Sequence, residues 1–192
     1  MHSNSLPLGN TPLAFEDIKN LLQHHQSLSI TQQAYDDIIK CRRYLDEKLD
    51  GSEELFYGIN TGFGFFQDIK IDKQQLKELQ NNLLKSHACG LGEEVPADIV
   101  KLMMMLKIKS LSYGYSGVSI EIVNRLVEMF NKEVWPVIYT QGSLGASGDL
   151  APLSHLCLPL IGLGEVNHKG EKYVAQEVLN KFGWQPIELQ EA

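Results

Sequence analysis

Apolar residues recur at spacings of three and four along most of the chain, which is the pattern of helices with one buried face. The clearest case begins after Ser29 or Thr31, since either hydroxyl can cap a helix, and it stops at Gly51. The apolar positions between these limits are Ala34, Ile38, Cys41, Leu45 and Leu49. The pattern therefore predicts one long helix over this stretch.

The same periodicity, together with residues that begin and end helices, predicts further helices. Asp72 and Gln75 form a capping box for one of them. Its inner face is expected to carry Leu76, Leu79, Leu83 and His87. Four more helices are predicted. The first starts at Pro96 and runs through Ser110, and the other three span about Ser119 to Asn131, Asp149 to about Leu160, and Ala175 to Phe182. The predicted fold class is mainly α, with a few short strands and hairpins.

Two stretches lack this helical pattern. Residues 1–10 are polar and are expected to be a loose N-terminus, ahead of one domain over residues 11–192. Residues 165–173 predict a small surface hairpin with its turn near Gly170. His168 on this hairpin is expected to be solvated.

Composition and charge narrow the possible partners. The 192 residues are 43% hydrophobic, enough to bury a core, and the formal net charge is −7 from 17 basic and 24 acidic residues. Without a basic cluster, this balance argues against nucleic acid or an anionic membrane as a partner. The strongest uncharged apolar run, Leu156 to Gly164, is too short to span a bilayer, and the N-terminus has no apolar signal core.

Cysteine and histidine usage indicates a reducing compartment and no metal site. The three cysteines, Cys41, Cys89 and Cys157, are odd in number and widely spaced, as free thiols would be. His24-His25 has no third ligand candidate nearby, so a surface loop is expected there. We therefore expect a cytoplasmic protein.

The tripeptide Ala146-Ser147-Gly148 can make an electrophile from the chain itself. Small neighbours let the backbone fold back at Ser147, and Gly148 has no Cβ to obstruct that conformation. The Gly148 amide nitrogen can then attack the Ala146 carbonyl carbon and close a five-membered ring. Loss of water there and from the Ser147 side chain leaves an exocyclic methylene, an electrophilic carbon that no unmodified side chain offers.

Other interpretations of these residues have to be compared with this one. A Gly/Ser/Asp cluster before Leu-Ala-Pro-Leu is also typical of a loop that enters a helix, with Asp149 as N-cap and Pro152 in the first turn. A serine-hydrolase nucleophile elbow requires glycine two residues after the serine, where Asp149 stands. Asp149 at that position argues against a serine hydrolase, and the tripeptide alone leaves the loop interpretation open.

A second glycine-rich stretch, residues 56–66, combines three glycines with aromatic side chains, as binding loops often do. It does not match a dinucleotide-binding loop, because Gln67 stands where the third glycine of that motif is required. Tyr57 within it is either a buried core tyrosine or, less commonly for this residue type, a general base.

The residues from Gln141 to His155 resemble the prosthetic-group loop of the aromatic amino acid lyase family, which contains the histidine, phenylalanine and tyrosine ammonia-lyases. In that family Ala-Ser-Gly cyclises to 4-methylideneimidazol-5-one (MIO). Tyr57-Gly-Ile-Asn-Thr-Gly-Phe-Gly64 is similar to the family's second signature, in which the tyrosine is the catalytic base. The resemblance extends from about Leu13 to the end of the chain, and Phe65-Phe66 departs from the usual residues.

The resemblance assigns roles to particular residues and implies neither a metal nor a nucleotide cofactor. These residues are Ala146, Ser147 and Gly148 for MIO formation, Ser147 and Tyr57 for catalysis, Asp149 and Leu150 for support of the MIO, and Gly64 for substrate binding.

Ser86-His87 looks like the substrate-selecting position of the histidine ammonia-lyases, and both side chains can exchange hydrogen bonds with an imidazole. The resemblance then implies deamination of L-histidine to urocanate and ammonia, the first step of histidine degradation, in a homotetramer. A tyrosine or phenylalanine ammonia-lyase or aminomutase would share the Ala146-Ser147-Gly148 motif. A non-catalytic helical interaction domain that retains the motifs is the alternative from another class.

Members of the family continue through a long helical bundle, so the chain is expected to be an N-terminal piece of such a protein. The apolar faces around Leu76 to Leu83 and Ile99 to Leu106 would then lack partners. The isolated chain is therefore expected to self-associate and to be inactive.

Overall fold

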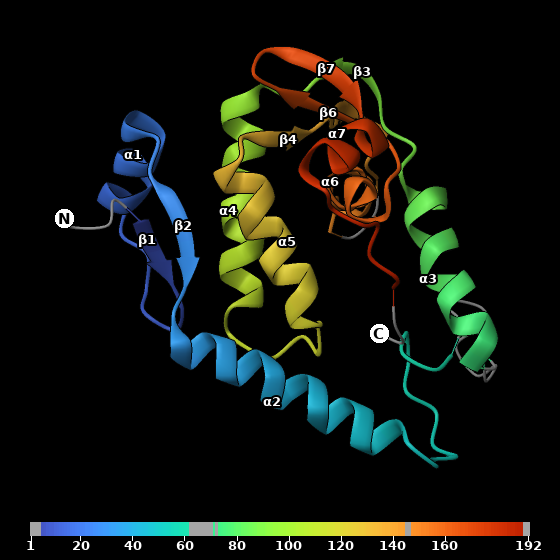
Figure 1. Cartoon of the computed structure of the whole chain (residues 1–192). Helices are drawn as coiled ribbons and strands as arrows, with labels where there is room; N and C mark the ends of the chain where they lie inside the picture. The colour runs from blue at the N-terminus through green and yellow to red at the C-terminus, as the bar shows by residue number, and fades with distance from the viewer. Residues whose placement is uncertain (1–4, 62–70, 72, 145–146, 190–192) are drawn as a thin grey trace. The chain divides into compact units, whose positions relative to one another are not determined.

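The computed structural model describes residues 5–61, 71, 73–144 and 147–189 of the chain (Figure 1). The helices are α1 Phe15–His24, α2 Gln32–Leu49, α3 Lys73–His87, α4 Ala97–Leu111, α5 Ile120–Asn131, α6 Leu150–Cys157, the 3₁₀ helix η2 Leu158–Ile161, and α7 Ala175–Phe182. The strands are β1 Ser5–Leu8, β2 Ser27–Ile30, β3 Leu91–Glu94, β4 Val134–Pro136, β5 Tyr139–Gln141, β6 Glu165–His168 and β7 Glu171–Val174. The mainly α class with a few short strands is confirmed.

The chain divides into two compact units. The sequence pattern had marked no boundary between residues 11 and 192. Unit 1 comprises Met1–Glu47, Pro96–Trp135 and Asn167–Glu171, and unit 2 comprises Lys48–Val95, Pro136–Val166 and Lys172–Ala192. The strands form two pairs, β1 with β2 and β3 with β5, and a three-stranded sheet of order β4-β6-β7.

Unit 1 is built on the helices α4 and α5, which lie side by side (Figure 1). The core of this unit includes Met104, Met105, Ile108, Leu126 and Met129, all fully buried. The Asn131 side chain ties the end of α5 to β2, because its Oδ1 accepts from the Leu28 amide at 2.7 Å and its Nδ2 donates to the Leu28 carbonyl at 2.9 Å. None of the described helices is long and apolar enough to cross a membrane.

Two lysines of α4 point inward and hold the N-terminal part of unit 1. The Lys109 ammonium donates to the carbonyls of Gly9 and Thr11, the latter at 2.7 Å, and lies 4.5 Å from the centre of the Tyr113 ring. Lys101 donates to the Leu21 carbonyl at 3.3 Å. Backbone carbonyls thus satisfy these two buried ammonium groups, which helical periodicity alone would have placed on a solvated face.

Replacing Lys109 with methionine is expected to destabilise the protein by about 1–3 kcal/mol, because the Gly9 and Thr11 carbonyls lose their buried donor. Lys107→Met removes the same charge from the same helix and serves as the control. Urea denaturation of the three proteins checks this, and equal midpoints for Lys109→Met and the unchanged chain would contradict the assigned role.

Two expectations are wrong: the loose N-terminus over residues 1–10, as far as residues 5–8 are concerned, and the solvated His168. Residues 1–4 lie outside the described residues. Residues 5–8 form β1, which pairs in parallel with β2 from Ser5 opposite Ser27 to Leu8 opposite Ile30, and Leu8 is fully buried. A long-range parallel pairing of this kind leaves little local signal in a short segment. His168 is only 3% exposed, and its Nδ1 lies 3.3 Å from the Glu133 carbonyl oxygen. The hairpin itself, β6 and β7 with Gly170 at φ +82° in its turn, is confirmed.

In unit 2, α3 packs against α6, and β3 pairs antiparallel with β5. The helix predicted to reach Leu160 is α-helical only to Cys157 and continues as η2. Pro159 explains this change, because it has no amide hydrogen for an α-helical bond. In unit 1, Ile99 and Leu106 of α4 are 47% and 51% exposed, and self-association of the isolated chain stays a prediction.

Candidate active site

The predicted electrophile belongs to residues 142–149, called here the Ser147 loop, which connects β5 to α6. Gly142 and Gly148 have φ of +107° and +71°, so both bends use the left-handed region that glycine adopts readily. Asp149 is the N-cap of α6, as expected, although its side chain makes no capping hydrogen bond. Ser147, Asp149 and Leu150 are exposed, and Ala146 lies outside the described residues.

The described part of the Ser147 loop fits backbone cyclisation. A Cβ placed on Gly148 would meet no described atom within 4 Å other than those of its chain neighbours. The Ser143 hydroxyl donates to the Gly148 carbonyl and holds the bend from outside. Gly148 therefore has the left-handed conformation of a tight bend.

Ser86 and His87 occupy the last turn of α3. The Ser86 hydroxyl donates to the Leu83 carbonyl at 3.1 Å, and His87 Nδ1 lies 2.8 Å from the same oxygen. If Nδ1 carries the proton that this bond needs, Nε2 of the neutral His87 ring is an acceptor. His87 is half-buried and Ser86 is exposed, so both side chains lie at the surface of unit 2 where a ligand can reach them.

The segment after α3 joins this pair to the Ser147 loop. The Gly90 amide donates to His155 Nε2 on α6 at 2.9 Å, and Leu91 pairs with Gln141 at the end of β5. Cys89 Sγ lies 3.8 Å from the Gly142 carbonyl oxygen. The structure therefore brings the Ser86-His87 end of α3 to the base of the loop that carries Ser147.

The aromatic rings of Tyr139 and His155 pack together at the junction where the segment after α3 meets α6. The rings of Tyr139 and His155 meet edge to face, with centroids 5.3 Å apart. Burial lowers the pKa of His155 below its ordinary value, which favours the neutral ring that accepts from Gly90. Burial, and then the Glu165 carboxylate, raise the pKa of Tyr139, so this tyrosine stays protonated and is not suited to be a base.

Tyr57 lies in unit 2 on a separate turn that buried polar side chains hold. Asn60 Oδ1 accepts from the Phe56 amide at 2.7 Å, and Asn60 Nδ2 donates to the Glu54 carbonyl at 2.8 Å. Thr61 Oγ1 accepts from the Gly58 amide at 3.3 Å. Tyr57 is 63% exposed in this chain, so it is not part of the core of unit 2. Gly64 lies outside the described residues.

Sequence reasoning did not find the residues that hold these segments. Asn60 and Thr61 fix the Tyr57 turn, and His155 and Gly90 join α6 to α3, yet none was assigned a role. The sequence offered one signal for these four residues, because each lies within or next to a recognised motif. Among the described residues, no group of three His, Cys, Asp or Glu side chains could hold a metal ion.

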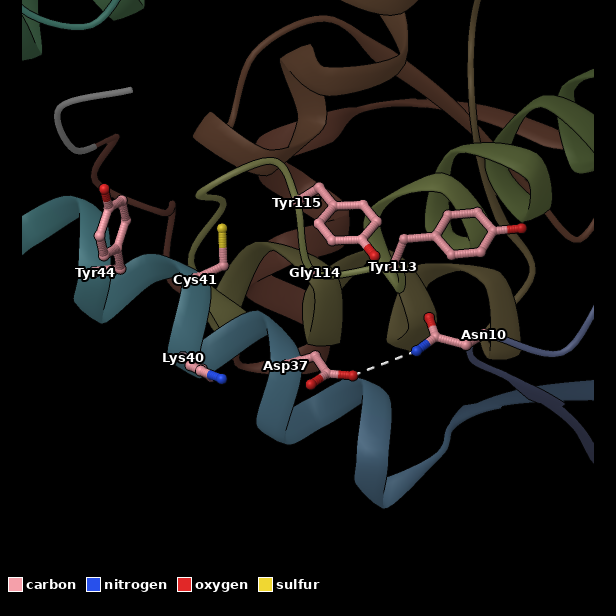
Figure 2. A pocket seen from close by; sticks show the side chains of 8 residues that line it. All are labelled: Asn10, Asp37, Lys40, Cys41, Tyr44, Tyr113, Gly114 and Tyr115. Atoms are coloured by element: carbon pink, nitrogen blue, oxygen red, sulfur yellow. Dashed lines mark hydrogen bonds between the residues drawn. The ribbon is translucent and has the colours of Figure 1, made fainter.

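Unit 1 carries a separate hollow of about 310 Å³ that contains none of the predicted site residues. Figure 2 shows Asn10 hydrogen-bonded to Asp37, at 3.4 Å, on its rim. The Gly114 backbone approaches Asp37 closely, since a Cβ there would lie 2.8 Å from the Asp37 carbonyl carbon. The lining residues are Asn10, Asp37, Lys40, Cys41, Tyr44, Tyr113, Gly114 and Tyr115.

Comparison with known proteins places these features in a family. The model of the aromatic amino acid lyases matches residues 13–192. A histidine ammonia-lyase of Staphylococcus aureus (strain bovine RF122 / ET3-1) is 46% identical over 186 residues, which are 97% of this chain and 37% of that protein. The chain thus spans little more than a third of the length of the curated relatives it matches.

Solved structures give the same result. Histidine ammonia-lyase from Trypanosoma cruzi is similar with a TM-score of 0.85 and 31% identity over 97% of this chain and 35% of that one. Phenylalanine aminomutase from Pantoea agglomerans is similar with a TM-score of 0.89 and 29% identity over 97% of this chain and 36% of that one. With the matched family model covering both the Tyr57 turn and the Ser147 loop, the chain belongs to the aromatic amino acid lyase family.

Proposed function

We propose that the whole protein containing this chain is a histidine ammonia-lyase, which converts L-histidine to urocanate and ammonia as the first step of histidine degradation. The observation that carries the proposal is the junction at Gly90, where the Ser86-His87 end of α3 meets the base of the Ser147 loop. The 46% identity to a histidine ammonia-lyase supports the same substrate.

The reactive group of the proposal is an MIO made from Ala146-Ser147-Gly148. The Gly148 nitrogen bonds to the Ala146 carbonyl carbon, and two waters leave, one with that carbonyl oxygen and one with the Ser147 hydroxyl. The left-handed bend at Gly148 supports this ring closure. An MIO supplies an electrophilic methylene carbon that can capture the substrate.

In the proposal, different side chains bind the substrate and remove its proton. Tyr57, acting through its deprotonated oxygen, takes up the β-proton of the substrate, while the C–H electron pair forms the new double bond and the α-amino group leaves as ammonia. Asn60 and Thr61 hold the turn that carries the exposed Tyr57. His87 Nε2 accepts from the imidazole N–H of the substrate, because its Nδ1 is engaged with Leu83. Gly64 contributes to the substrate pocket.

The N-terminus of α6 supports the electrophile. Asp149 and Leu150 stand at the N-terminus of α6, where the unpaired amides carry a partial positive charge that would stabilise negative charge on an MIO. The proposal includes no metal or nucleotide cofactor and no nucleic-acid or membrane partner. The whole protein is proposed to act as a homotetramer in the cytoplasm, with active sites shared between subunits.

Incubating the whole protein separately with L-histidine, L-tyrosine and L-phenylalanine, and following urocanate and the two arylacrylates by absorbance, tests the substrate. We expect urocanate to form fastest. A clear preference for tyrosine or phenylalanine, or a β-amino acid product from an aminomutase, would contradict the proposal. Absence of any conversion would favour a non-catalytic role.

His87→Leu in the whole protein is expected to lower kcat/KM for L-histidine by about 10- to 100-fold, because the imidazole loses its hydrogen-bond partner in the pocket. His25→Leu, at an exposed residue of unit 1, is the control. Steady-state kinetics of the two variants check this, and an unchanged kcat/KM in His87→Leu would remove His87 from the substrate site.

A further inference from the structure

The backbone at Cys89–Gly90 is held from two sides by residues that flank the Ser147 loop. On one side the Gly90 amide donates to His155 Nε2 on α6, after the loop, at 2.9 Å. On the other side is Gly142, at the start of the loop. A Cβ on Gly142 would lie 2.9 Å from the Cys89 carbonyl oxygen and 3.0 Å from Gly90 Cα. Gly142, the first residue of the loop, and His155, on the helix that follows the loop, therefore both approach Cys89–Gly90.

The contact with His155 includes a close approach at position 90, where any added side chain would push the imidazole away. A Cβ on Gly90 would lie 2.9 Å from His155 Nε2 and 3.2 Å from Tyr139 Cβ. The Tyr139 ring in turn packs edge to face on the imidazole and restricts its rotation. The acceptor nitrogen is thus fixed opposite the Gly90 amide.

We propose that His155 is a positioning residue: it locks the segment from Ser86 to Gly90 onto α6, the helix that follows the Ser147 loop, and so fixes His87 relative to the reacting group. The expected effect on the reaction rests on the proposed function, whereas the contact between Gly90 and His155 does not depend on it. Because His87 is three residues before Gly90, release of Gly90 lets His87 shift. A misplacement of about 1 Å in a catalytic site can cost about 10²-fold in rate.

Two variants of the whole protein separate the hydrogen bond from simple packing. His155→Leu fills the space without an acceptor, whereas His155→Gln keeps an acceptor oxygen near the place of Nε2. The first measurement is the alkylation rate of Cys89 by N-ethylmaleimide, followed by peptide mass mapping, because Cys89 is exposed and adjoins Gly90. The second is the separate determination of kcat and KM for L-histidine.

We expect His155→Leu to alkylate about tenfold faster at Cys89 and to lose about 10²-fold in kcat/KM, and His155→Gln to stay within about threefold of the unchanged protein in both. Gly90→Ala, whose methyl group displaces the same contact, is expected to behave like His155→Leu and provides a second variant if that one does not fold.

Equal Cys89 alkylation in the unchanged protein, His155→Leu and Gly90→Ala would overturn the proposal. So would equal losses in His155→Leu and His155→Gln, since the acceptor would then not matter. If the unchanged protein proved to lack lyase activity, the proposed function would fail, while the alkylation rates would still decide whether His155 locks the segment.

Discussion

Ser147→Ala in the whole protein is expected to lower ammonia-lyase activity by about 10³-fold or more, because alanine has no hydroxyl to lose and the methylene carbon cannot form. Ser147 is exposed on its loop, so the substitution should change the free energy of unfolding by no more than about 0.5 kcal/mol. Loss of activity would then report chemistry and not misfolding.

Ser110→Ala is the matched control, since Ser110 is an exposed serine on α4 of unit 1. Urocanate formation and circular dichroism of both variants are the measurements. Activity of Ser147→Ala within about tenfold of the unchanged protein would refute the role of Ser147 as the source of the electrophile.

The second large effect is expected at Tyr57. Tyr57→Phe keeps the ring and removes the hydroxyl, so a general base is lost while the surface of the turn is preserved. We expect kcat for L-histidine to fall about 10²- to 10⁴-fold, with a smaller change in KM. Stability should not change appreciably, because the side chain is 63% exposed and Asn60 holds the turn.

Tyr44→Phe is a close control, because Tyr44 is 64% exposed and lies in unit 1. Steady-state kinetics of the two variants decide the assignment. A kcat of Tyr57→Phe equal to that of Tyr44→Phe would show that another group removes the proton.

The bounds of helices with strong caps and a clear apolar face could be predicted from the sequence almost to the residue. The helix expected after Thr31 is α2, and Thr31 Oγ1 accepts from the Ala34 amide at 3.2 Å. The helix expected over Ala175 to Phe182 is α7, which ends at Gly183 with φ +68°. In both cases the signal is local, so it survives without knowledge of the tertiary fold.

Features made by contacts between distant residues could not be read in this way. The strand β1 exists because it pairs with β2, and His168 is buried because of its place beside Glu133. The helix α1 was also missed, although Ile18, Leu21 and Leu22 recur at helical spacing and Asp17 accepts from the Ala14 amide.

The candidate site shows the same difference between local sequence signals and long-range contacts. The sequence motifs located Tyr57, His87 and Ser147, and the structure places them all in unit 2. The bond from Gly90 to His155 joins residues 65 positions apart, and no spacing rule connects them. Chemistry carried by a motif is visible in the sequence, whereas the residues that position the motifs become visible only in the fold.

Mass spectrometry of the whole protein tests the central claim most directly. We expect the peptide that contains Gln141 to His155 to be lighter than its encoded sequence by the mass of two waters, with the loss confined to Ala146-Ser147-Gly148. A peptide of unmodified mass, with an intact serine at position 147, would contradict the account.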